Sequence, residues 1–134
     1  MRKFLCLLLV GYASDLLGQI NIVEPDSYRV DDGPNHFQTG DFNEDGFVDI
    51  VTVNADPSSE NLSILINDLN GGFDDRLDIA LSDTPYEVAI EDVNTDGHLD
   101  IVVTIRRTDE VGVLLGDGDG NFGTPTYFTT GADT

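Results

Sequence analysis

The feature that most constrains this chain is that it repeats itself. The stretch GDFNEDGFVDI (Gly40–Ile50) recurs as EDVNTDGHLDI (Glu91–Ile101), 51 residues further on. When the alignment is extended to Gly40–Val53 and Glu91–Thr104, seven of the fourteen positions are identical. A fixed period near 50 residues is typical of a propeller, a solenoid or another repeat array.

The repeat extends beyond this stretch in both directions. Pro34 and Pro85 are also 51 residues apart, and LSILINDLNGGF (Leu62–Phe73) parallels VGVLLGDGDGNF (Val111–Phe122) at an offset of 49 residues. We therefore expect one unit at 34–84 and a second at 85–134, which includes the start of a third. Residues 19–33 precede the first unit as a leading strand and linker.

Each unit is predicted to contain four short strands. Apolar runs such as DIVVTI and VGVLL are typical of buried strands, and no window shows a helical period. The segments NDLNGG and GDGDGN supply residues that tolerate positive φ in the turns between strands. In the second unit we expect the strands at Tyr86–Glu91, Leu99–Ile105, Glu110–Leu115 and Thr124–Thr129.

A four-stranded unit of about 50 residues has the size of a propeller blade. The predicted fold is therefore all-β, with about two four-stranded antiparallel blades and one extra strand around Tyr28–Val30. Propellers close with about four to eight blades, so we expect an incomplete propeller. Further repeats or self-association would complete it. A truncated product without independent function is the alternative, because two blades leave strand edges and faces uncovered.

The repeated stretch predicts a loop that binds a cation. Positions 1, 3 and 5 direct their oxygens toward one centre, a glycine at position 6 permits the sharp turn, and an acid at position 9 closes the shell. The backbone carbonyl at position 7 faces the same centre. In the first copy these positions are Asp41, Asn43, Asp45, Phe47 and Asp49, and in the second Asp92, Asn94, Asp96, His98 and Asp100.

Three carboxylates and one amide form a hard oxygen set that favours Ca²⁺, so we expect two calcium sites. An EF-hand is excluded, because it needs helical flanks and an acid at position 12, where Thr52 and Val103 stand. An ion-free turn is the other alternative. Without an ion the neighbouring carboxylates of the loop would repel one another, because two unit charges 4 Å apart repel by about 4 kcal/mol at an effective dielectric of 20. A solvated turn gives no reason to keep that arrangement twice.

Two other acidic turns lack parts of this pattern. Asp117, Asp119 and Asn121 alternate correctly, but Phe122 stands where the glycine belongs and Pro125 where the closing acid belongs. We expect a plain hairpin turn here, and likewise at Asp68 and Asn70 in the first unit.

Composition disfavours two classes of partner. The chain has 26 acidic and 6 basic residues, a net charge of −20, which disfavours nucleic acid and anionic membrane surfaces. A hydrophobic content of 40% argues against disorder. A net charge of this size is favourable for a protein that binds cations.

The N-terminus has the pattern of a secretory signal. The chain begins Met-Arg-Lys and continues with the apolar run FLCLLLV (Phe4–Val10), which is too short to span a bilayer. We predict a signal peptide at 1–18, cleaved after Ala13 or Gly18, and a secreted or cell-surface product. Cleavage would remove Cys6, the only cysteine. The alternative is a buried strand from a truncated domain.

The motif D-x-N-x-D-G-x-x-D, followed by an apolar strand and the hairpin LLGDGDGNF (Leu114–Phe122), resembles the FG-GAP/VCBS repeat family. The resemblance covers about 31–134. It implies β-propeller blades related to those of integrin α subunits, with calcium held in the loop between the first and second strands of each blade. It further implies an extracellular scaffold for adhesion, or for binding a protein or carbohydrate ligand.

The resemblance leaves an enzymatic alternative open, because related propellers occur in secreted carbohydrate-active and hydrolytic enzymes. Against catalysis in this chain, its two histidines, His36 and His98, stand in non-equivalent places without a Ser or Cys partner in a recognisable motif. We therefore expect a non-catalytic module with no catalytic residues and no organic cofactor.

Overall fold

The computed structural model describes residues 6–7, 27–70 and 72–131. All regular structure in these ranges is β-strand. No helix in this part of the chain is long and apolar enough to cross a bilayer. The strands are β1 (Cys6–Leu7), β2 (Ser27–Tyr28), β3 (Pro34–Gly40), β4 (Asp49–Asn54), β5 (Asn61–Asn67), β6 (Phe73–Ala80), β7 (Pro85–Glu91), β8 (Asp100–Ile105), β9 (Glu110–Leu114) and β10 (Thr126–Thr129).

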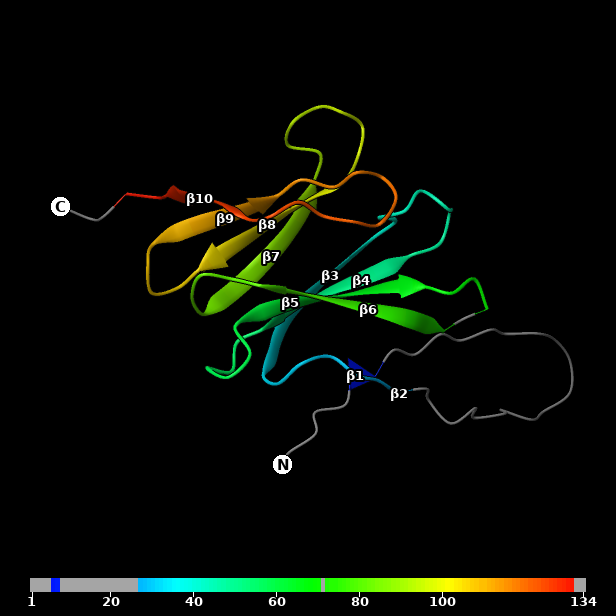
Figure 1. Ribbon diagram of the computed structural model, residues 1–134, viewed down its shortest axis with the longest axis horizontal. Helices are drawn as coiled ribbons and strands as arrows, with labels where there is room; N and C mark the ends of the chain where they lie inside the picture. The colour runs from blue at the N-terminus through cyan, green and yellow to red at the C-terminus, as the bar shows by residue number, and fades with distance from the viewer. Residues whose placement is uncertain (1–5, 8–26, 71, 132–134) are drawn as a thin grey trace, which may run out of the picture.

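Each repeat unit forms one four-stranded antiparallel sheet in which neighbouring strands follow one another along the chain (Figure 1). The first sheet has the order β3-β4-β5-β6, and the second the order β7-β8-β9-β10. This confirms the predicted all-β fold with two four-stranded units. The last strand begins at Thr126 instead of Thr124, because Pro125 has no N–H to donate to β9.

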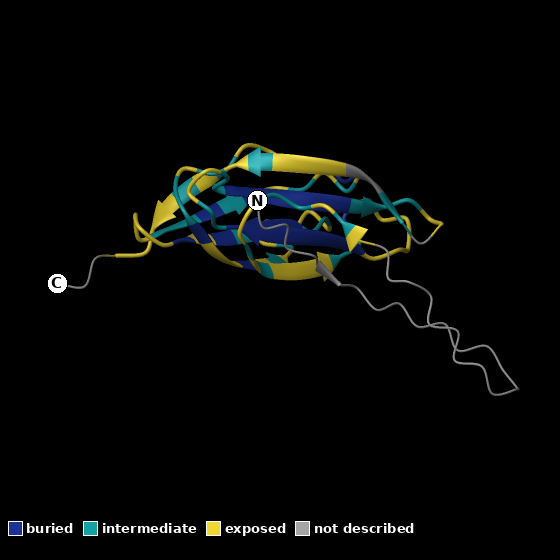
Figure 2. Ribbon diagram, turned by 90° about the horizontal axis from the view of Figure 1, so that it is seen from below, coloured by how far each residue is buried: buried dark blue, intermediate teal, exposed yellow. Residues whose placement is uncertain are grey.

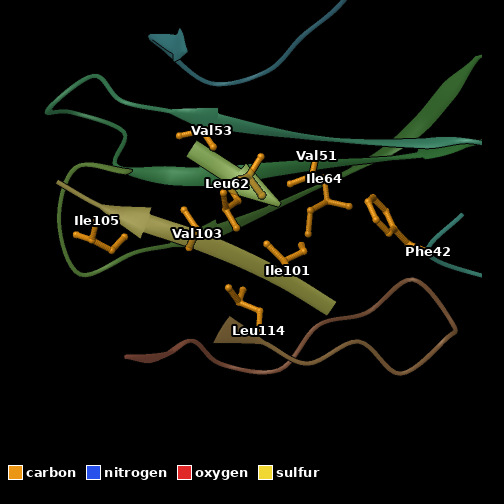
Figure 3. Close-up of a cluster of buried hydrophobic side chains, with 10 residues drawn as sticks. Phe42, Val51, Val53, Leu62, Ile64, Ile101, Val103, Ile105 and Leu114 are labelled. Atoms are coloured by element: carbon orange, nitrogen blue, oxygen red, sulfur yellow. The ribbon is translucent and has the colours of Figure 1, made fainter. Parts of the chain in front are cut away.

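The two sheets pack face to face, with β3 beside β7. We call the face that carries Val51 and Val53 the front face of the first sheet, and the face that carries Ile101 and Val103 the back face of the second. These two faces enclose the core (Figure 3). Its buried members are Phe42, Val51, Val53, Leu62, Ile64, Val88, Ile101, Val103, Ile105 and Leu114. In the edge-on view the buried residues form the middle layers (Figure 2).

The two units pack head-to-tail, with the front face of the first sheet on the back face of the second. Val51 corresponds to Val102, so the front face of the second sheet is the equivalent of the face that the first sheet buries. All six residues of β4 are buried, whereas in β8 Val102 is only partly buried and Thr104 is exposed. β4 and β8 have similar sequences, yet both faces of β4 are covered and only one face of β8 is.

The leading strand is shorter than predicted. β2 ends at Tyr28, and the chain then leaves the strand because Arg29 and Asp31 direct backbone groups to side chains of the first sheet. β2 pairs antiparallel with β1, where Cys6 lies opposite Tyr28. The rest of the predicted signal peptide and both cleavage positions lie outside the described residues, so secretion stays a prediction.

Candidate metal-binding loops

The first acidic loop connects β3 to β4 and curls around its own aspartates. Asp41 Oδ1 accepts the N–H of Asp45 at 3.1 Å, and its Oδ2 accepts the N–H of Gly46 at 2.9 Å. Asp45 Oδ1 accepts the N–H of Phe47 at 2.9 Å, and its Oδ2 accepts the side-chain amide of Asn43 at 2.8 Å. The hydrogen bonds of Asp41 and Asp45 thus fold the loop back on itself, whereas the convergence of the oxygens at positions 1, 3 and 5 on one cation stays a prediction.

The second loop, between β7 and β8, reproduces this network. Asp92 Oδ2 accepts from Gly97 N at 2.9 Å, and Asp92 Oδ1 from Asp96 N at 3.2 Å. Asp96 accepts from His98 N at 2.9 Å and from the amide of Asn94 at 2.7 Å. Because the same contacts form in two different surroundings, the motif itself determines the shape of the loop.

The ninth-position acid has a role that the sequence analysis missed. Asp49 is fully buried, and its two oxygens accept the N–H groups of Phe42 and Asn67, both at 2.8 Å. It therefore ties the loop to the end of β5. Burial raises the pKa of Asp49, its two hydrogen bonds oppose that rise, and the charges of Asp45 and Asp41 add to it. The three carboxylates thus lie within electrostatic reach of one another.

Asp100 makes the equivalent clamp in the second loop. It is also fully buried, and its oxygens accept from Val93 N at 3.0 Å and from Gly116 N at 2.9 Å. The only signal for this role in the sequence is that the acid opens an apolar strand, where an unpaired buried charge would be costly.

Two positions in each loop have left-handed backbone conformations. Gly46 and Gly97 have φ of 89° and 97°, and open space surrounds the place where a Cβ would stand. Glycine is needed there for conformation and not for room. At position 4, Glu44 and Thr95 have φ of 57° and 65°, which the sequence analysis did not anticipate. A β-branched threonine is especially unfavourable in this region.

The second sheet supports the first loop directly. Gly120, in the turn between β9 and β10, donates its N–H to the carbonyl of Phe42 at 3.0 Å. The Phe42 ring packs edge-on against Phe122, with centroids 5.5 Å apart. The equivalent of Phe42 in the second loop is Val93. Phe42 is 3% exposed and Val93 47%, so the second loop lacks this cover.

A side-chain pair also links the two loops. His98 Nδ1 lies 2.6 Å from Glu44 Oε1, and this contact raises the pKa of His98. The imidazole therefore contacts the neighbouring loop, and only the His98 carbonyl is left for the predicted ligand role. Gly118 lies so close to this pair that a Cβ there would collide with the imidazole.

The other two acidic turns close hairpins. Asp68 Oδ1 accepts the N–H groups of Asn70 and Gly72, at 2.8 and 2.7 Å. Asp117 Oδ1 accepts those of Asp119 and Asn121, at 2.9 and 3.1 Å. Each aspartate stabilises its own turn, the arrangement expected of Asx-rich turns.

The donors of both loops fit a hard divalent cation, since all are oxygens and most are carboxylates. In residues 6–7, 27–70 and 72–131, however, no three His, Cys, Asp or Glu side chains stand in the arrangement of a metal site. The oxygens accept N–H groups instead. A carboxylate oxygen has a second lone pair, so these bonds are compatible with coordination.

Comparison with known families identifies the repeat. Residues 41–103 match the model of the FG-GAP-like repeat, and such repeats form propeller blades. The match begins at the first aspartate of the first loop and ends in β8, beyond the second loop. No curated protein and no solved structure matches the chain.

Proposed function

We propose that the two acidic loops each bind one Ca²⁺, and that the chain is a calcium-stabilised, non-catalytic module of an extracellular binding scaffold. The observation that carries the proposal is the duplicated network in which Asp41 and Asp92 accept the N–H of the glycine at position 6, while the acid at position 5 accepts the side-chain amide of the asparagine at position 3.

The electrostatics give the ion a physical role. Burial and the charges of Asp45 and Asp41 raise the pKa of Asp49, which means that folding makes its ionised form less favourable. A divalent cation between these groups would offset both effects. Calcium would therefore stabilise the folded state, because the unfolded chain does not gather the same carboxylates.

The two sites are expected to differ in strength. The first loop is held by Gly120 and by the packing of Phe42 on Phe122, whereas Val93 in the second loop is exposed. A preorganised loop loses less conformational entropy on binding. We therefore assign the tighter site to the first loop and the weaker to the second.

A binding scaffold is favoured over an enzyme because both histidines make contacts between the two repeat units. His36 Nδ1 accepts the N–H of Val88 at 3.3 Å, and His98 contacts Glu44. In a scaffold of this kind the ligand is an extracellular protein or carbohydrate, and a further repeat would cover the open front face of the second sheet. A non-catalytic part of a secreted carbohydrate-active or hydrolytic enzyme is the second candidate, with the same calcium sites.

Thermal unfolding in calcium, magnesium or chelator tests the proposal. Millimolar calcium should raise the midpoint well above its value in chelator. Magnesium should raise it less, because that ion requires a smaller and stricter octahedron. Equal midpoints in calcium and chelator would contradict the proposal.

A further inference from the structure

The back faces of the two sheets differ at positions that the repeat makes equivalent. In the second sheet the back face is apolar and packs on the first sheet, and Val103, Ile105 and Gly112 belong to it. In the first sheet the corresponding residues are Thr52, Asn54 and Ser63. Each is polar and almost completely buried.

These polar residues form a closed hydrogen-bond network. The side-chain amide of Asn54 donates to Asn61 Oδ1 at 2.7 Å and to Ser63 Oγ at 2.8 Å. Ser63 Oγ in turn donates to Asp78 Oδ1 at 2.7 Å. Among the described residues no buried side-chain nitrogen or oxygen lacks a partner. The network is thus satisfied without help from another protein surface.

The segment between β2 and β3 completes the network. Asp31 N donates to Ser63 Oγ at 3.3 Å, and Asp31 Oδ2 accepts from Asn61 Nδ2 at 2.6 Å. This bond holds the pKa of Asp31 below its ordinary value, so the carboxylate is charged at neutral pH. Arg76, paired with Asp78, donates to the carbonyl of Arg29 in the same segment.

The open front face of the second sheet has the opposite character. It carries Val102, Val111 and Val113, which are partly buried, and Phe128, which is 56% exposed. Their counterparts in the first sheet, such as Val51 and Leu62, pack on an apolar back face. If such a front face met the network around Asp31, it would exclude water from charged and polar groups without giving them new partners, which is costly.

We propose that the back face of the first sheet, with the segment that carries Asp31, is a built-in end cap that prevents this chain from packing head-to-tail on the front face of a second copy. Repeat arrays need a polar outer face at their ends to stay soluble. In this chain the polar face is built from Thr52, Asn54 and Ser63, which stand where the second sheet has Val103, Ile105 and Gly112.

The test replaces the polar residues of this face by the residues at the equivalent positions of the second sheet. Thr52→Val, Asn54→Ile and Ser63→Gly introduce the residues of the second sheet, and Asp31→Ser introduces the residue at the equivalent position, 82. Sedimentation across a concentration series at fixed calcium should show the fourfold variant forming species larger than a dimer, because head-to-tail contacts do not end at two copies. Wild type should form no such larger species at the same concentrations.

The matched control adds Val113→Asp, which places a charge on the opposite face. It should return the fourfold variant to the mass of wild type and leave wild type unchanged. The cap is refuted if the folded fourfold variant does not associate, or if its association survives Val113→Asp. The cap is also refuted if the Val113→Asp variant of the wild-type chain sediments with a lower mass than wild type. Should the fourfold variant not fold, the milder pair Asp31→Ser and Ser63→Gly must show the same association, weaker but sensitive to Val113→Asp.

Discussion

Replacing the fifth-position acid in each loop separates the effect of calcium from that of local hydrogen bonds. Asp45→Ala and Asp96→Ala each remove one predicted ligand. They also remove the acceptor for one backbone N–H, at Phe47 or His98, and for the Asn43 or Asn94 amide. These bonds are exposed, so their loss alone should cost little, about 1 kcal/mol or less in each variant.

The calcium contribution follows from mass action. Extracellular calcium modules bind at roughly 0.1–1 mM, and at ten times the dissociation constant one site stabilises by about 1.4 kcal/mol. Two independent sites would contribute about twice that. Without the ion, Asp45→Ala also removes a charge that disfavours ionised Asp49, which offsets part of the lost hydrogen bonding.

Urea unfolding with calcium and with chelator measures both contributions. Each variant should lose stability mainly in calcium, and Asp45→Ala should lose more than Asp96→Ala because the first loop has the support of Gly120. Asp119→Ala is the matched control, since its hairpin turn lacks the closing acid, and its loss should be the same in both solutions. Equal losses with and without calcium for Asp45→Ala would refute the reasoning.

Three further predictions concern the folded chain itself. Phe42→Ala should lower the free energy of unfolding by about 3–5 kcal/mol, because it empties a buried site against Phe122, whereas the exposed equivalent Val93→Ala should change it little; similar losses in urea titrations would be contrary to the packing. Thr95→Asn should stabilise the chain by about 1 kcal/mol, since Asn tolerates the left-handed conformation better, and a loss in the same titration would argue against that strain. The amide of Asn61 lowers the pKa of Asp31 from its ordinary 3.8, so the stability it provides is present above that pH and is lost as the pH falls through the folded pKa. The advantage of wild type over Asn61→Ala in acid titrations should shrink accordingly, and an advantage that grows toward low pH would reverse the sign.

The sequence was sufficient to predict the sheets, because the repeat fixes the period and the turn residues punctuate the strands. It was also sufficient to predict the sharp turn at Gly46, since that conformation is a local property of the chain. It was not sufficient for Asp49, whose second partner, Asn67, lies on β5 and depends on strand pairing.

The end cap depends on even longer-range information. Thr52 and Ser63 are ordinary strand residues in the sequence, and only their register across β4 and β5 places them on one face. The contact of Asp31 with Asn61 then joins residues 30 positions apart. Likewise, the exposure of Val102 compared with Val51 reflects which sheet has a neighbour, and a strand pattern does not contain that information.

Calcium titration calorimetry on the folded 134-residue chain measures directly whether both loops bind calcium. We predict two calcium ions bound per chain, the tighter one lost in Asp45→Ala and the weaker one lost in Asp96→Ala, with both retained in Asp119→Ala. Absence of calcium binding at millimolar concentration, or the same loss in Asp119→Ala as in Asp45→Ala, would contradict it.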